Sequence, residues 1–196
     1  MKDGYHSLLL AYAAGILDEA QDMIVSAHIG LSRRGRDYVS SYESLGGCMI
    51  EDYCEPVAMS ESALDHVLAC IDKAEEVQQP CPPKPSECDF FEEIAAFMPP
   101  PMPAQIQPLC SGQRWSHLMP GIDIFDLPLT CKQSHARLMR VKPSGRTPHH
   151  GHKGVEITLV LDGAYADESG EYTRGDLIVA DEHFEHKPSA CPDRGC

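Results

Sequence analysis

The 196-residue chain has few basic residues, no C-x-x-C pair and no apolar run long enough to cross a membrane. Sixteen Lys and Arg stand against thirty Asp and Glu, which gives a formal net charge of −14 at pH 7. Affinity for DNA comes largely from Lys and Arg that neutralise phosphates, so this charge argues against direct nucleic-acid binding. A basic protein, or the basic surface of a DNA-binding protein, is a more natural partner for this chain.

The nine cysteines are scattered and odd in number, which is not the pattern of a disulfide framework. The N-terminal segment has an apolar run of only about seven residues, too short to span a membrane, and no cleavage-site pattern follows it. We therefore expect a cytoplasmic protein with reduced thiols and no membrane partner.

Residues 1–76 carry helical periodicity and no strand signals, and we expect them to form a small helical domain. Apolar side chains recur every three to four positions in this part. In the run over residues 17–34, acidic residues lie near the start, as the helix dipole favours. We expect helices at residues 7–14, 17–34 and 60–76, and a further helix from about Tyr38 that ends at Gly46 and Gly47.

Residues 77–104 hold eight of the sixteen prolines, and we interpret them as a Pro-rich linker. Within this linker, residues 89–98 have the pattern of a short amphipathic helix. Its apolar face, with Phe90, Ile94 and Phe97, is expected to dock onto another part of the chain.

From residue 105 the pattern changes to short apolar runs separated by Gly, Pro, Asp and Ser. Runs at this regular spacing predict an antiparallel sandwich or barrel over residues 105–196. The expected fold is therefore α+β and multidomain, with strands at residues 115–118, 121–127, 135–141, 155–161, 163–167 and 175–180.

Five of the ten histidines lie between Thr147 and His186. His150 and His152 are two residues apart, so in a strand they face the same side, and Glu156 can join them from the next strand past a turn at Gly154. With His186 they make three imidazoles and one carboxylate, which suits zinc and also iron, manganese or nickel. We expect His149 and His183, in contrast, to be exposed or to stand behind the ligands.

Two spacings in this region resemble cupin motifs. The first is Gly145-x4-His150-x-His152-x3-Glu156-x6-Gly163, one residue short before its first histidine, and the second is Gly175-x5-Asp181-x-His183-x2-His186. Asp181 and His183 stand where most cupins have Pro and Gly, so the turn there is expected to differ.

The run from His150 to Pro188 resembles more specifically the cupin-like domain of the ChrR anti-sigma factors, in which the same four positions bind zinc. The N-terminal run LLLAYAAGILDEAQDMIVSAHIGLS resembles the zinc-binding anti-sigma domain of that family. The resemblance implies that the helices bind an extracytoplasmic-function sigma factor and release it in response to oxidants such as singlet oxygen or peroxides.

The N-terminal zinc motif of that family is degraded in this chain. The resemblance implies ligands at an N-terminal histidine and along a His-x3-Cys-x2-Cys run, but here the run is His28-x3-Ser32-x2-Gly35. The N-terminal histidine is expected where Asp3 stands, and His6 lies three residues too late, a displacement of about 5 Å along a helix. We therefore expect one metal ion per chain, in the cupin-like domain, and a helical domain that packing holds together.

The cupin-like domain of the family also continues beyond the last ligand, whereas this chain has ten further residues. A barrel with an unpaired edge invites association with a second copy, so a homodimer through the cupin domain is expected. Cys191 and Cys196, near the metal-bearing end, are either redox-active or inert thiols.

We interpret the chain as an anti-sigma factor-like transcriptional regulator that senses oxidative stress through a metal-bound cupin domain. One alternative is a metal-dependent cupin enzyme of the dioxygenase or isomerase type, with the metal as Lewis acid. Against it, the sequence offers no separate general base or substrate clamp. Another alternative is a cupin-only binding protein whose helical half is vestigial.

Overall fold

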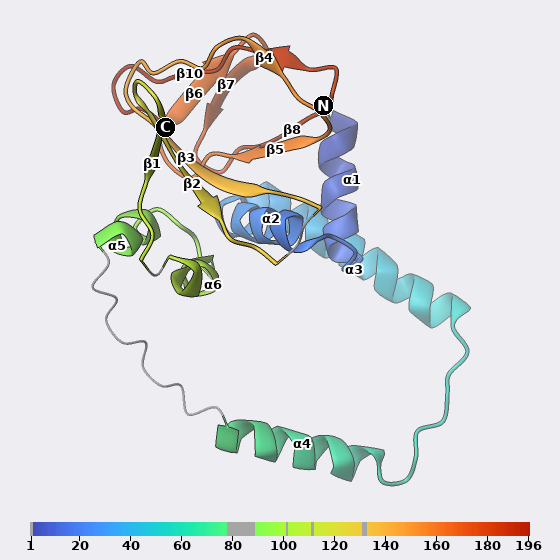
Figure 1. The fold of residues 1–196 in the computed structure, drawn as a ribbon. Helices are drawn as coiled ribbons and strands as arrows, with labels where there is room; N and C mark the ends of the chain where they lie inside the picture. Colours follow the sequence, from blue (N-terminus) through green and yellow to red (C-terminus); the bar gives the residue numbers. More distant parts are fainter. Residues whose placement is uncertain (1, 78–88, 101, 111, 131–132) are drawn as a thin grey trace.

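A computed structural model describes residues 2–77, 89–100, 102–110, 112–130 and 133–196. Helices occupy the N-terminal part and antiparallel strands the C-terminal part, which confirms the α+β fold class (Figure 1). The helices are α1 (Lys2–Ala13), α2 (Glu19–Leu31), α3 (Arg33–Tyr53), α4 (Ala63–Val77), α5 (Asp89–Ala95), α6 (Met102–Ile106) and the 3-10 turn η1 (Gln107–Leu109). The strands are β1 (Ser116–Met119), β2 (Ile122–Leu127), β3 (Ala136–Val141), β4 (His150–Gly151), β5 (Glu156–Leu159), β6 (Ala164–Asp167), β7 (Gly170–Thr173), β8 (Leu177–Ala180), β9 (Glu185–His186) and β10 (Ser189–Ala190).

The predicted helices are present, but several of their ends differ from the prediction: α1 begins at Lys2 and α3 at Arg33, each about five residues earlier than expected. The helix expected over residues 17–34 ends at Leu31, because Ser32 caps a new helix with its side chain accepting from the Gly35 N–H. The helix expected to stop at Gly46 and Gly47 continues to Tyr53, so that prediction was wrong. A glycine weakens a helix by only about 1 kcal/mol, and the apolar stripe of α3 continues beyond the pair.

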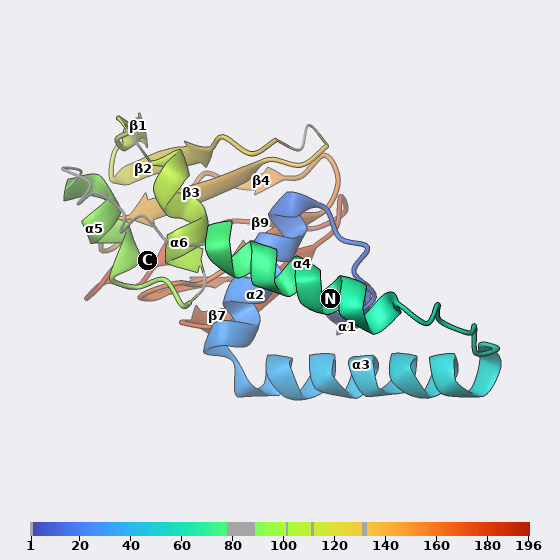
Figure 2. The same cartoon turned by 90° about the horizontal axis from the view of Figure 1, so that it is seen from below.

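Helix α4 stands apart from the rest of the structure (Figure 1). Every side chain from Leu64 to Lys73 is exposed, including the apolar stripe of that helix. The second half of α3 is similarly open, whereas its first half packs against α1 and α2. Figure 2 shows α3 running past the body of the protein toward the segment that leads to α4.

All the predicted strands form, and they pair antiparallel. One sheet has the order β1-β2-β3 and another the order β10-β6-β7, while β4 pairs with β9 and β5 with β8. The two-residue strand β10 and the polar strand β7 were not predicted, because two-residue strands and polar runs leave no apolar alternation to detect. Strands β4 and β9 were expected only as the strands that carry His150 and His186. Within the described residues, no helix combines the length and apolar character that crossing a membrane requires.

The helices share their hydrophobic cores with the strands. Leu9 on α1 and Val25 on α2 are fully buried, and partly buried Ile157 on β5 and Val179 on β8 pack against their cluster. Helix α2 also contributes to a second core, which contains the following residues of α2, α5, α6, β2 and β3: Met23, Ala27, Phe90, Ile94, Met102, Ile106, Phe125, Leu127 and Leu138. Helix α2 is therefore packed between the two cores, and it joins the helical part to the barrel.

Within the predicted linker, the amphipathic helix over residues 89–98 is confirmed as α5. Phe90 and Ile94 are buried in the core that α5 shares with α2 and the barrel, and Phe97 is partly buried there. Helix α6 was not predicted, and residues 78–88 lie outside the described residues. Among the described cysteines, Cys48, Cys54 and Cys70 are exposed free thiols, and Cys191 and Cys196 are partly buried free thiols.

Candidate metal centre

Three of the four predicted ligands come together at one end of the barrel. His150 on β4 pairs directly with His186 on β9, and His152 follows two residues after His150. One ligand nitrogen from each of these histidines lies within 4.8 Å of the others. Gly154, with φ +126°, turns the chain from this strand toward β5, as the sequence predicts. The geometry therefore forms a three-histidine group that is able to bind a metal ion.

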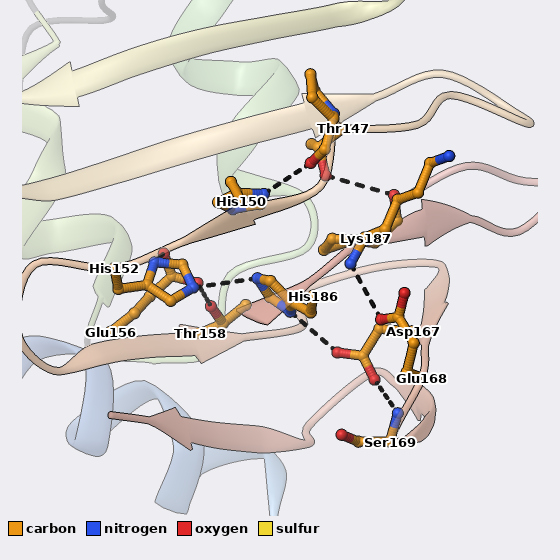
Figure 3. Close-up of polar contacts among 12 residues, drawn as sticks. Thr147, His150, His152, Glu156, Thr158, Asp167, Glu168, Ser169, His186 and Lys187 are labelled. Carbon is orange, nitrogen blue, oxygen red and sulfur yellow. Dashed lines mark hydrogen bonds and ion pairs between the residues drawn. The ribbon is translucent and has the colours of Figure 1, made fainter. Parts of the chain in front are cut away.

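Each of the three imidazole rings has an oxygen atom at Nδ1. These oxygens only accept, so each Nδ1 carries the hydrogen and each Nε2 presents a lone pair. Metal-binding histidines in proteins are usually held in this way, with the second ring nitrogen donating to a carboxylate or a carbonyl. The pairs are His150 Nδ1 with the Pro148 carbonyl at 2.9 Å, His152 Nδ1 with Glu156 Oε2 at 3.0 Å, and His186 Nδ1 with Asp167 Oδ2 at 3.0 Å (Figure 3).

The Nε2 atoms of His152 and His186 face each other at 3.2 Å. Two lone pairs at that distance repel, and a metal ion bound between them would turn this repulsion into attraction. Two nitrogens bound to one tetrahedral zinc at about 2.0–2.1 Å lie about 3.3 Å apart, close to the observed separation. The carboxylates of Glu156 and Asp167 stand behind these rings and balance the charge of a divalent ion. The donor set and its geometry thus fit a divalent metal.

Glu156, the fourth predicted ligand, does not join the group of ligand atoms within 4.8 Å. One of its carboxylate oxygens contacts His152 Nδ1 and the other accepts from the Thr158 hydroxyl at 3.2 Å. Its side chain is 39% exposed, whereas that of His152 is 10% exposed. The carboxylate therefore lies beside the site and orients His152, and its coordination of a metal stays a prediction.

Asp167 was not singled out from the sequence, although its side chain is fully buried against His186. Its second carboxylate oxygen accepts from the Ser169 N–H at 2.8 Å. The sequence did contain a signal for Asp167. Tyr165 and Asp167 are two residues apart on β6, so they share a face of the strand, and Tyr165 faces the core. A carboxylate on the inward face of a strand needs a partner, and here that partner is a candidate metal ligand.

The turn before His186 differs from the cupin pattern, as expected. The Asp181 side chain accepts from the His183 N–H at 2.9 Å, and its carbonyl accepts from the Phe184 N–H at 3.1 Å. The aspartate thus closes the turn in place of the usual Pro and Gly. His149 and His183 are both exposed.

His6 and His28 of the helical domain are each held by hydrogen bonds rather than by a shared metal group. His6 Nδ1 contacts the Tyr42 hydroxyl at 2.8 Å, whereas His28 contacts Tyr5 and Gly175. Across the described residues, a metal-binding group of three or more His, Cys, Asp or Glu forms at the barrel site alone.

Comparisons with known proteins match both halves of the chain. The family model of the ChrR cupin-like domain covers residues 107–196. The chain is 34% identical over 184 residues to the anti-sigma-E factor ChrR of Cereibacter sphaeroides, across 94% of this chain and 81% of that protein. It is also similar to a chain in the crystal structure of Rhodobacter sphaeroides SigE in complex with the anti-sigma ChrR. There the TM-score is 0.73 at 32% identity, over 97% of this chain and 91% of that chain.

Proposed function

This chain belongs to the ChrR family of anti-sigma factors, and on that premise we propose that it binds an extracytoplasmic-function sigma factor and holds it inactive. One similar protein is named an anti-sigma-E factor, and a similar structure is that of a complex with SigE. In this proposal residues 1–76 bind the sigma factor, residues 77–104 form the connection, and residues 105–196 sense oxidative stress.

The observation that carries this proposal is the uncovered apolar face of α3 and α4. Residues Leu45, Met49 and Tyr53 form one stripe on α3, and each is more than half exposed. Residues Leu64, Val67, Leu68 and Ile71 form a second stripe on α4, with exposed fractions between 49% and 66%. Monomeric proteins rarely leave such contiguous apolar surface uncovered, and helices of this kind commonly bind a partner through it.

The charge around these stripes indicates the chemistry of the partner. Residues 40–77 contain nine acidic side chains and one basic side chain, Lys73. A partner that fits this surface presents apolar residues bordered by Lys and Arg. The DNA-contacting surface of a sigma factor has that character, and covering it would keep the factor from DNA.

For the barrel we propose one metal ion, held by His150, His152 and His186 with Glu156 as the fourth ligand. Zinc fits three nitrogens and one oxygen, and iron, manganese and nickel accept the same donors. Together these residues would tie β4, β5 and β9 into one arrangement. Oxidation or loss of a ligand would release the strands and loosen the grip of the helices on the sigma factor.

The sigma-binding proposal is tested by co-expressing the chain with extracytoplasmic-function sigma factors from its own genome. We expect a stable 1:1 complex with one of them on size-exclusion chromatography. Leu68→Asp should weaken that complex at least about tenfold, because it places a charge in the apolar contact. Ala69→Asp, about 100° further round α4, is the matched control and should change the affinity less than about twofold.

Both α4 variants should keep the stability of the free chain, since their side chains are exposed in it. Failure to form a complex with any of the sigma factors, or equal effects of the two variants, would contradict the proposal. Oxygen-dependent turnover by an iron-loaded chain that forms no complex would instead favour the cupin enzyme.

The metal proposal is tested by elemental analysis of the purified chain and of single variants. His186→Ala should lower the metal content to near zero, while His149→Ala, an exposed histidine beside the site, should keep it. Glu156→Gln should lower the affinity without abolishing binding if three histidines remain. A metal content that all three variants leave unchanged would exclude this site.

A further inference from the structure

The resemblance of the helical domain to its family implies a zinc ion at His28 and at the positions of Ser32 and Gly35. The structure provides a test of whether these residues fit one. His28 is the only one of the three with a side chain able to bind zinc strongly, and it is 3% exposed. The hydrogen bonds of His28 and its contact with Gly35 show what fills the space of the zinc ion in this chain.

Both ring nitrogens of His28 are already bonded. Nδ1 lies 2.9 Å from the Gly175 carbonyl, which only accepts, so Nδ1 carries the hydrogen. Burial lowers the pKa of His28, against smaller opposing effects of the Gly175 carbonyl and the Asp176 carboxylate, so the ring is neutral. Its Nε2 therefore accepts from the Tyr5 hydroxyl at 2.9 Å. The lone pair that zinc would need is engaged by Tyr5.

The two positions of the missing thiolates are bonded to each other. Ser32 caps α3 through its Oγ, which accepts from the Gly35 N–H at 3.1 Å. A Cβ atom on Gly35 would lie 2.6 Å from His28 Nε2, closer than real Cβ contacts allow. A side chain at residue 35 is thus incompatible with this position of the imidazole, and the residues do not fit a zinc ion.

We propose that a hydrogen-bond relay from Tyr5 through His28 to Gly175 takes the place of zinc in this domain and fastens it to the barrel. The relay joins α1, α2 and the turn between β7 and β8, over a separation of 147 residues between His28 and Gly175. A zinc ion bound within the helices would secure only the helices. The relay secures the helices and the barrel at once.

Packing around the relay supports the same junction. Leu31 lies against Gly175, where an added Cβ would meet the Leu31 Cβ at 3.4 Å. An added Cβ on Gly4 of α1 would meet Val179 of β8 at 3.1 Å. The outer faces of β5 and β8 are covered by α1 and α2 through Ile157 and Val179, which are also paired with each other across the two strands.

This junction lies next to the candidate metal centre along the strands. Ile157 faces the helices, and its neighbour Glu156 contacts His152 at the other side of β5. Since adjacent strand residues face opposite sides, a shift of β5 at the metal centre moves the surface on which α1 and α2 rest. The relay fixes the far end of the same strand pair, so the helices follow the barrel as one body.

Two measurements test the relay without using sigma binding. Elemental analysis of the full chain should find at most one metal ion, and none in the variant His150→Ala/His152→Ala/His186→Ala. Metal that persists in this triple variant and disappears on His28→Ala would overturn the proposal. Nitrogen-15 NMR of the unmodified chain should show His28 as the Nδ1–H tautomer, unchanged by added zinc or by a chelator. A His28 signal that responds to zinc would equally overturn it.

The fastening role is tested by hydrogen exchange at the turn between β7 and β8. His28→Phe keeps a ring of similar shape and removes both bonds, and should speed exchange of the Gly175 and Asp176 amides about tenfold, the scale of one lost hydrogen bond. His6→Phe is the matched control, because the His6–Tyr42 bond stays within the helices. Equal exchange rates in the two variants would contradict the role, and the NMR tautomer stands as the test should His28→Phe not fold.

Discussion

The carboxylate of Asp167 lies 3.0 Å from Nδ1 of His186, on the side of the ring that faces away from His152. This contact holds the hydrogen on Nδ1 and leaves Nε2 as the lone pair toward the metal centre. Because the Asp167 side chain is fully buried, water is not available to replace it as the acceptor. Asp167 is therefore a positioning residue for a metal bound by His186.

Asp167→Asn should lower the metal affinity about 10- to 100-fold, because its amide NH₂ can turn toward Nδ1 and favour the wrong tautomer. Competition with a chromophoric chelator measures the affinity directly. Asp193→Asn, an exposed residue near the C-terminus, is the control and should keep the wild-type value. Equal affinities for the wild type and the Asp167 variant would show that the contact has no positioning role.

Two glycines of α3 should respond in opposite directions to the same substitution. Gly47→Ala meets open space and should raise the free energy of unfolding by about 0.5–1 kcal/mol, because it removes a flexible residue from a helix. Gly35→Ala drives a Cβ against His28 and should lower that free energy by about 1–3 kcal/mol. Urea denaturation followed by circular dichroism checks both values. Stabilisation by both alanines would mean that the imidazole moves aside without cost.

The stability of the chain should depend on pH through His28. Burial lowers its folded-state pKa below the ordinary value of about 6.5, so the unfolded chain binds the proton more readily. This contribution is complete above about pH 6.5 and is lost as the pH falls through the window between the ordinary pKa and the folded one. Tyr5 and Asp176 are the other ionisable groups beside the ring, and both remain when His28 is replaced by glutamine.

The measurement is the difference in unfolding free energy between the wild type and His28→Gln across this pH range. The advantage of the wild type should shrink as the pH is lowered, because the folded chain resists protonation of His28. A wild-type advantage that grows on acidification would contradict the sign of the shift.

Cys196 should be a slow thiol. Its burial raises its pKa to about 11, so the thiolate that reacts with oxidants or alkylating agents is scarce at neutral pH. It packs against the cluster of Val160, Tyr165 and Ile178. Its backbone N–H donates to the Val141 carbonyl, and its carbonyl accepts from the Val141 N–H. Peptide mass spectrometry after brief alkylation of the native chain should find Cys196 labelled far more slowly than exposed Cys48. Rapid labelling of Cys196 would restore it as a redox candidate.

Much of the candidate site could be predicted because its spacing follows from strand geometry. His150 and His152 share a face by their separation of two residues, and the turn at Gly154 brings Glu156 alongside. The expectation that Glu156 binds directly remains a prediction, since in this structure its carboxylate contacts the back of the His152 ring. The choice between the two positions depends on a side-chain rotation that spacing does not constrain.

In the helical half, too, some features could be predicted from the sequence and others could not. The loss of both thiolates at Ser32 and Gly35 was visible in the sequence, and the amphipathic pattern of α3 and α4 predicted helices. The replacement of zinc was not visible, because Tyr5, His28 and Gly175 are far apart in the chain. Their local sequences carry no pattern that joins them.

By itself the sequence determined the α+β organisation, the helical stripes and the His-rich motif, because these depend on periodicity and on residues close together along the chain. Only the tertiary structure decided that Asp167 supports His186, that the helices share a core with the barrel, and that His28 is bonded to Gly175. These relationships depend on the packing of segments that are distant in sequence. Burial decides which polar groups must find partners, and packing decides which partners are within reach.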